Sequence, residues 1–294
     1  MHNAVLDMIE SYNCSSTEDY KNALKEVIQE IALLGLFRGK FFDKAAFYGG
    51  TALRIFYGLQ RFSEDLDFSL IRPEESYDIT PQLEYIQNEL ESYGFSVDVI
   101  KKEKSEKSAI ESAFIKGNTL THMVKIQISE LPEYILHPDE IFKIKLEVDT
   151  DPPGGAEYEV KYHLKPIPFS VRLFTLESLF AGKVHAILCR KWKNRVKGRD
   201  YFDYVWYLSR GTALNLYHLE ERMKQTGHLR EHEVLEKDNV YELLFSKFDS
   251  VNLKQAVSDV RPFVKEQDSL KLWSPEFFTA ITKEIGRASC RERV

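Results

Sequence analysis

A stretch of alternating acidic and apolar residues constrains the fold of this chain more than any other feature. Asp65 and Asp67 alternate with Leu66 and Phe68, and this period of two predicts a half-buried β-strand over residues 66–70. Alternate residues of a strand point to the same face, so both carboxylates project together. Carboxylates about 5–7 Å apart repel each other unless a cation lies between them. The pair therefore predicts a site for Mg²⁺, which binds one or two protein carboxylates besides phosphate oxygens and water.

A glycine turn precedes the acidic strand. Residues 41–48 predict a short buried strand, and residues 52–59 predict a helix that begins directly after Gly49 and Gly50. Glycine lets the backbone approach a phosphate closely, and a helix N-terminus offers free N–H groups and the positive end of a dipole. Thr51 offers both a helix cap and a hydroxyl for a phosphate. The turn is therefore expected to bind a triphosphate next to the metal.

Three further residues are expected to complete this site. Arg61 and Ser63 precede the acids and are expected to contact the β- and γ-phosphates. Residues 142–148 alternate cleanly and predict a strand, which ends in acids. Asp149 is chosen as the third metal-binding carboxylate, with Glu147 as the competitor. Each motif alone has an ordinary alternative, since acid pairs occur on surface strands and glycine is common in turns.

The C-terminal half of the chain has helical patterns. Residues 176–191 form an apolar helix in which Lys183 lies close to the buried stripe, so this lysine must reach solvent or a negative partner such as a triphosphate. Asp200 and Asp203 are three residues apart and share a helix face. One is expected to bind substrate or order Lys183, while the other caps the helix or pairs with Arg199. The alternative is an ordinary acid pair that stabilises the helix dipole.

Composition limits the class of protein. The net charge is −6, yet residues 183–199 carry seven basic side chains and no acid. The part of this stretch at 190–199 is expected to attract RNA, although a solvated helix face is the alternative. The three cysteines lie far apart without a CxxC pair, which suits a reducing cytoplasm and excludes a cysteine-based zinc site. His185 has no metal-ligand spacing to another histidine and is interpreted as structural.

The pattern predicts an α/β (α+β) chain, with a mixed sheet domain followed by a helical domain. The first domain spans residues 1–165, and the second spans residues 166–285 and completes a cleft. Residues 286–294 lack apolar periodicity and are interpreted as a disordered or foreign tail. No membrane span or signal peptide is predicted, because there is no apolar run of about 18 residues and the N-terminus is acidic.

The expected elements of these domains follow from periodicity and turn residues. We expect helices at residues 17–38, 81–93, 200–209 and 216–225, strands at residues 95–100, 121–128 and 142–148, and an exposed turn or hairpin tip at residues 101–112.

Four motifs together resemble one known family. They are Gly49-Gly50-Thr51-Ala52-Leu53-Arg54, Arg61-x-Ser63-x-Asp65-x-Asp67-Phe68, Leu179-Phe180-Ala181-x-Lys183 and Lys197-Gly198-Arg199-Asp200-x-x-Asp203. In order and spacing they resemble the AbiEii/AbiGii nucleotidyltransferase-like toxins, over roughly residues 20–285. The first two motifs are shared across the DNA polymerase β-like superfamily, and the last two indicate this family.

The resemblance implies a function and a set of essential residues. It implies a Mg²⁺-dependent (or Mn²⁺-dependent) nucleotidyltransferase that uses a nucleoside triphosphate, with tRNA 3′ ends as the acceptor of some members. It also implies the toxin of a type IV toxin–antitoxin or phage-defence pair, encoded beside a winged-helix antitoxin. By motif match, the essential residues are Ser63, Asp65, Asp67, Lys183 and Asp200. Two alternatives stay open: a transferase that modifies a protein or small molecule, and a non-catalytic nucleotide-binding module.

Overall fold

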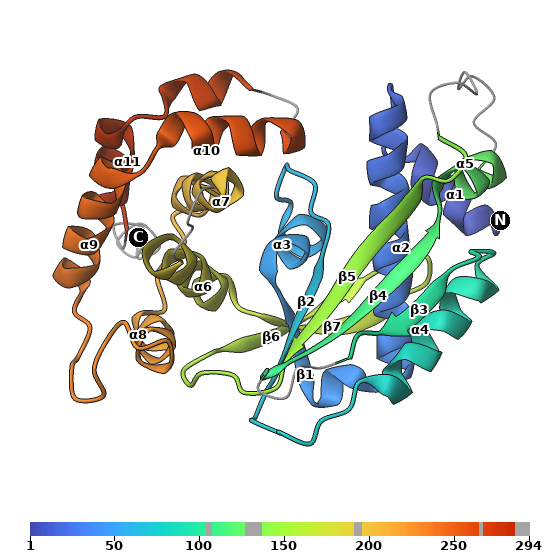
Figure 1. Cartoon of the computed structure of the whole chain (residues 1–294), viewed down its shortest axis with the longest axis horizontal. Coiled ribbons are helices and arrows are strands. Elements are labelled where there is room, and N and C mark those ends of the chain that lie inside the picture. Colours follow the sequence, from blue (N-terminus) through green and yellow to red (C-terminus); the bar gives the residue numbers. More distant parts are fainter. Residues whose placement is uncertain (104–107, 127–136, 191–195, 265–266, 286–294) are drawn as a thin grey trace, which may run out of the picture. The chain divides into compact units, whose positions relative to one another are not determined.

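The acidic strand lies in the middle of a mixed sheet (Figure 1). The computed structural model describes residues 1–103, 108–126, 137–190, 196–264 and 267–285. Within these residues seven strands form one sheet in the order β3-β4-β5-β2-β1-β7-β6. The strands are β1 Ala45–Tyr48, β2 Leu66–Leu70, β3 Asp98–Lys101, β4 Ile110–Asn118, β5 Ile141–Asp149, β6 Tyr158–His163 and β7 Phe169–Phe174. The predicted strands at 66–70 and 142–148 are thus confirmed, as is the mixed α/β fold class.

The register around β2 determines which side chains surround its acids. Strand β1 pairs with β2 in antiparallel fashion and places Tyr48 opposite Asp67. Strand β5 pairs with β2 in parallel and places Glu147 opposite Asp67 and Asp149 opposite Ser69. The apolar residues of these strands, such as Phe68, are fully buried, which is the alternation that the sequence predicts.

Helices accompany the sheet in the first part of the chain. They are α1 Asn3–Glu10, α2 Thr17–Arg38, α3 Gly49–Tyr57, α4 Thr80–Ser92 and α5 Thr119–Lys125. The predicted helix over residues 17–38 is confirmed, and Ser16 and Asp19 form a capping box at its start. Its residues are buried almost continuously from Ala23 to Leu36, since it contacts α1, α4, α5 and β5. The predicted helix over residues 81–93 is α4, shifted by one residue.

Several local predictions in this part were wrong. Residues 119–125 form a helix where a strand was predicted, because Asn118 caps the chain there by accepting a hydrogen bond from the backbone N–H of Thr121. Strand β4 begins inside the stretch predicted as an exposed turn, and β6 and β7 were not predicted. Helix α3 begins three residues earlier than expected, on the glycines themselves.

The later part of the chain is helical, as predicted. Its helices are α6 Leu176–Cys189, α7 Gly198–Ser209, α8 Leu216–Gln225, α9 Lys237–Ser250, α10 Leu253–Val260 and α11 Pro275–Thr282. Helix α6 contacts α7, α8 and α9, and α7 contacts α10 and α11 (Figure 1). Large aromatic side chains fill the space between them, and Phe180, Tyr204, Tyr207, Phe248 and Phe278 are fully buried.

Two compact units divide the chain. Unit 1 contains residues 1–58, 62–152 and 160–173, and unit 2 contains residues 59–61, 153–159 and 174–294. The assignment of residues 1–165 to a catalytic domain and residues 166–285 to a helical domain stays a proposal. The predicted tail at 286–294 lies outside the described residues. Among the described residues, no helix has the length and apolar character needed to cross a membrane.

Candidate active site

In unit 1 the two acids lie where a strand begins. Asp65 directly precedes β2, and Asp67 is its second residue. Both are half-buried, whereas Leu66 and Phe68 between and beside them are completely covered. The strand therefore keeps its apolar side in the core and holds two carboxylates at the accessible side, which are suitable oxygen ligands for a divalent cation.

Gly49 begins helix α3 directly against Asp67. Its φ is +83°, a left-handed conformation that favours glycine. A Cβ atom at this position would lie 2.5 Å from Oδ2 of Asp67 and 3.1 Å from its Cβ. The absence of a side chain thus lets the carboxylate lie next to the first turn of α3, whose N–H groups and dipole favour negative charge. The glycine motif and the acid motif are therefore in direct contact, through Gly49 and Asp67.

Thr51 has a different contact from the one predicted for it. It is completely buried, and its hydroxyl donates a hydrogen bond to the backbone carbonyl of Asp65. A direct contact of this hydroxyl with a phosphate does not fit that burial, because the side chain already links the first turn of α3 to the start of the acidic strand.

The acid opposite Asp67 on the neighbouring strand is Glu147, whereas the sequence favoured Asp149 as the third acid; which of the two completes the site stays a prediction. Strand register puts Glu147 opposite Asp67, whereas Asp149 is two positions further along β5, about 6.6 Å for a strand. Glu147 is also held in place, since Lys145 lies 2.6 Å from its Oε1. Asp149 accepts a hydrogen bond from the backbone N–H of Asp151 (3.0 Å). Such a contact with the residue two positions on is typical of an aspartate in a turn.

Ser63 lies on the segment that leads into β2. It is partly exposed, and its backbone carbonyl accepts a hydrogen bond from the side-chain amide of Gln29 (3.1 Å). Gln29 is completely buried in α2, so the segment before the acids is attached to the core of unit 1. This attachment gives the hydroxyl of Ser63 a defined place near the start of the strand.

In unit 2 four charged side chains form an ion-pair cluster: Arg61, Lys183, Asp200 and Asp203. The ammonium of Lys183 lies 2.7 Å from Oδ1 of Asp200 and 2.8 Å from Oδ2 of Asp203. Arg61 donates to both carboxylate oxygens of Asp203, each at 2.6 Å. The expectation that an acid of α7 orders Lys183 is confirmed, and both acids do so.

The contacts of Arg61 contradict the prediction that it binds the β- and γ-phosphates. This side chain is only 3% exposed, and its Nε and Nη2 both donate to Asp203, so it does not fit a phosphate ligand. Arg61 and Asp203 are 142 residues apart in the chain, and no local pattern could have predicted their pairing. The predicted pairing of an α7 acid with Arg199 is replaced by a stacking contact, in which the guanidinium lies 4.2 Å from the ring centre of Phe263.

The charges in the cluster keep both aspartates ionised. Burial by itself raises the pKa of Asp203, but Arg61 and Lys183 outweigh it and hold that pKa below its usual value. Burial likewise opposes ionisation of Asp200, and Lys183 and Arg190 hold the pKa of that carboxyl low. Arg190 contacts Asp200 at 3.3 Å. Three cations thus surround two carboxylates, which leaves a formal charge of +1 in this group of side chains.

Close packing of α7 against α10 explains why the fourth motif contains a glycine, Gly198. A Cβ atom here would lie 1.8 Å from the backbone carbonyl oxygen of Ala256, so only glycine lets α7 begin against α10. The backbone N–H of Gly198 donates to a carboxylate oxygen of Asp259 (2.9 Å). This contact fixes the start of the helix that carries Asp200 and Asp203.

The basic stretch is described only in part. Arg190 already contacts Asp200, and burial lowers the pKa of Lys197. Lys191, Lys193 and Arg195 of the predicted RNA-attracting stretch lie outside the described residues. The attraction of RNA by residues 190–199 stays a prediction.

Paired carboxylates lie beside a glycine turn on a mixed sheet, as the predicted nucleotidyltransferase site requires. A model of the family "Nucleotidyl transferase AbiEii toxin, Type IV TA system" matches residues 31–282. The chain therefore belongs to the AbiEii family of nucleotidyl transferase toxins from type IV toxin–antitoxin systems. A search of curated proteins finds no match.

Two solved structures from Helicobacter pylori are similar to the chain. The crystal structure of JHP933 is 17% identical, with a TM-score of 0.49 over 94% of this chain and 97% of that one. The crystal structure of a putative nucleotidyltransferase is also 17% identical, with a TM-score of 0.47 over 95% of this chain and 100% of that one.

Proposed function

We propose that this chain transfers a nucleoside monophosphate from a nucleoside triphosphate to a hydroxyl group at the 3′ end of a tRNA. The observation that carries the proposal is the contact between the acid pair and the glycine turn: Asp67 lies against Gly49 where α3 begins. The carboxylates therefore lie next to a helix N-terminus. The carboxylates suit a divalent cation, and the helix N-terminus suits a phosphate.

The residues present fit a divalent cation. Asp65 and Asp67 would hold it, with Glu147 as the third carboxylate in place of Asp149. All are hard oxygen donors, which favours Mg²⁺, with Mn²⁺ as a substitute. When bound, the ion neutralises phosphate charge and lowers the pKa of the attacking hydroxyl.

The chain's own groups bind and orient the triphosphate in this proposal. Gly49 and Gly50 let phosphate oxygens reach the backbone N–H groups of α3, and the hydroxyl of Ser63 donates to a phosphate oxygen. Thr51 positions the backbone of Asp65 through its hydrogen bond to the Asp65 carbonyl. The acceptor hydroxyl attacks the α-phosphorus in line, a P–O bond forms there, and pyrophosphate leaves.

Lys183 and Asp200 have a supporting role in unit 2. Asp200 and Asp203 hold the ammonium of Lys183 between them, so this long side chain has one orientation. The net positive charge of the surrounding group favours an anionic ligand. We propose that Lys183 is the group of unit 2 that meets an anionic ligand as a point charge, and that Asp200 positions it.

The family also implies a partner. Members belong to type IV toxin–antitoxin systems, so an antitoxin partner and a nucleoside triphosphate substrate accompany the activity. We propose a winged-helix protein as the antitoxin and phage defence as the biological setting of the pair.

The test is transfer of label from each nucleoside triphosphate, labelled at the α-phosphate, to purified tRNA. We expect label on tRNA with wild type and with Asp98→Asn, an exposed acid of β3, and none with Asp67→Asn. Oxidation of the terminal ribose with periodate removes the acceptor hydroxyl and should abolish labelling. Label on oxidised tRNA would exclude the 3′ end as the acceptor. Label found only on protein or a small molecule would exclude RNA.

A further inference from the structure

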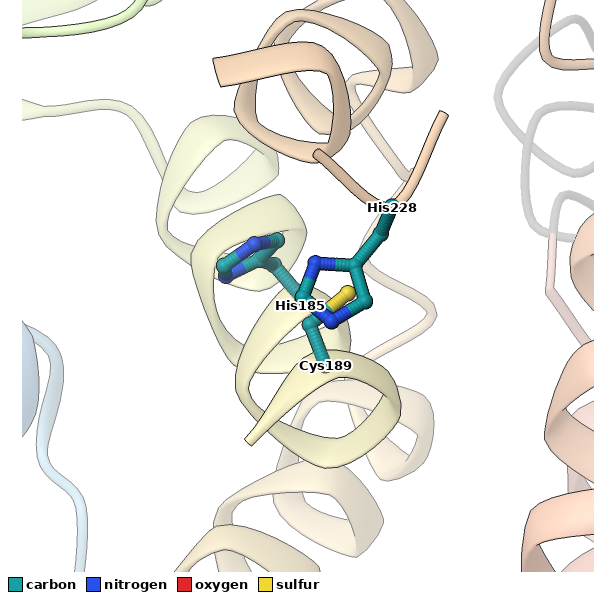
Figure 2. A group of neighbouring side chains, drawn as sticks. All are labelled: His185, Cys189 and His228. Carbon is teal, nitrogen blue, oxygen red and sulfur yellow. The ribbon is translucent and has the colours of Figure 1, made fainter. Parts of the chain in front are cut away.

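A histidine–cysteine cluster lies in unit 2, among side chains other than those of the ion-pair cluster. His185 and Cys189 are one helical turn apart on α6, and His228 lies on the segment that follows α8. One ligand atom from each residue lies within 4.8 Å of the others. Figure 2 shows the Cys189 sulfur beside the His228 ring, with the His185 ring next to them.

We propose that His185, Cys189 and His228 form a binding site for Zn²⁺. Two imidazoles and a thiolate are the ligand set of a soft or borderline cation, and zinc binds such mixed nitrogen–sulfur sets in tetrahedral geometry. Mg²⁺ prefers oxygen ligands, so this site and the carboxylate site select different ions. The three ligand atoms lie within 4.8 Å of one another, so small rotations of the side chains would bring them to the shorter separations around one ion.

A threonine already orients both imidazoles. The Thr226 hydroxyl lies 2.9 Å from Nε2 of His185 and 3.0 Å from Nδ1 of His228. It also donates to the backbone carbonyl of Arg222 (2.8 Å), which fixes its position at the end of α8. Metal-binding histidines commonly use their second ring nitrogen for such a contact. Thr226 is thus placed to support the ligands.

The cluster is open to solvent on one side. His228 is exposed, and a groove of about 260 Å³ is lined by Cys189, His228, Met223, Leu243 and Lys247. An ion can enter by this groove, and a water molecule can occupy the fourth position of a tetrahedron.

Bound zinc would join two segments of unit 2. The ion would connect α6 to the segment after α8, and α6 also carries Lys183, two residues before His185. Because the ion binds the folded arrangement, it stabilises unit 2 and the helix on which Lys183 lies. The inference is independent of the proposed transfer reaction.

The sequence predicted no cysteine-based zinc site, because it has no CxxC pair and His185 has no ligand spacing to another histidine. The cluster instead combines a histidine and a cysteine four residues apart with a distant histidine. The spacing of His185 and Cys189 on one helix face was the available signal.

Titration of the purified full-length chain with Co²⁺ tests the site. A cobalt–thiolate bond gives a near-ultraviolet charge-transfer band, and four-coordinate Co²⁺ gives strong visible bands, neither of which a carboxylate site produces. We expect both bands with wild type and their loss on addition of Zn²⁺. Cys189→Ser should abolish the charge-transfer band. His228→Ala, a change at an exposed side chain, should weaken binding by more than about tenfold.

Matched variants control for folding and for other thiols. Cys14→Ser, Cys290→Ser and His232→Ala, which changes an exposed histidine four residues after His228 in the chain, should keep the bands. Zn²⁺ should raise the Tm of wild type and of these three, but not that of His228→Ala. An absent band with wild type, or a full band with Cys189→Ser, would overturn the proposal.

Discussion

Replacing Gly49 by alanine tests whether the glycine turn positions the acid pair. The new Cβ would lie 2.5 Å from Oδ2 of Asp67, whereas ordinary contact begins at 3.4 Å, so the two groups must separate by about 0.9 Å. Rotation of the carboxylate alone cannot relieve this, since Cβ of Asp67 is also only 3.1 Å away. A displacement of about 1 Å at reacting groups costs about 10²-fold in rate.

The stability cost of the same change can be measured separately. Gly49 has φ +83° and Gly227 has φ +70°, so alanine at either position costs about 1–2 kcal/mol of backbone strain. A Cβ at Gly227 meets no atom within 4 Å. Gly227→Ala is therefore a matched control that carries the strain without the contact.

The assay compares kcat/KM for nucleotide transfer with unfolding in denaturant for both variants. We expect about a 100-fold loss of kcat/KM with Gly49→Ala and none with Gly227→Ala, at similar losses of stability. If Gly49→Ala kept wild-type kcat/KM while it lost stability, the glycine would serve the fold alone. The reasoning about Asp67 would then be refuted.

Three further predictions concern the third acid and unit 2. Glu147→Gln should reduce transfer at least about tenfold, whereas Asp149→Asn should leave it nearly unchanged; the reverse ranking in steady-state kinetics would restore Asp149 as the third acid. Asp203→Asn should cost about 3–5 kcal/mol in denaturant unfolding, because the buried guanidinium of Arg61 loses the carboxylate that it contacts at 2.6 Å through two nitrogens. Since the folded pKa of Asp203 is lowered, its contribution is complete above the ordinary value of 3.8 and is lost as pH falls through the lower folded value; an acid-unfolding curve that is unchanged in Asp203→Asn would contradict this. Gly198→Ala should destabilise the chain by about 1–3 kcal/mol or more through overlap with α10, and an unchanged Tm would show that the contact relaxes freely.

Elements with a strong period could be predicted from the sequence. The helix at 17–38 and the strands at 66–70 and 142–148 each repeat their apolar residues at one clear spacing. Burial of one face enforces that spacing in the strands, whereas the helix is buried almost continuously from Ala23 to Leu36. The accessible position of Asp65 and Asp67 could be predicted for the same reason, because they interrupt the apolar pattern only on one face of the strand; their role stays a prediction.

Other features depend on contacts that the local sequence does not encode. The stretch at 119–125 is rich in β-branched and apolar residues, yet the cap at Asn118 and burial of one face favour a helix. The choice between Glu147 and Asp149 depends on strand register, which the alternation in one strand cannot define. The pairing of Arg61 with Asp203 likewise requires the tertiary fold.

The most direct test of the central claim compares nucleoside triphosphates labelled at the α- and at the γ-phosphate, with wild type and Asp67→Asn. If Asp65 and Asp67 serve nucleotidyl transfer, only the α-label reaches the acceptor. One pyrophosphate is released for each label incorporated, and Asp67→Asn abolishes both. Transfer of the γ-label, or unchanged α-label transfer by Asp67→Asn, would contradict the account.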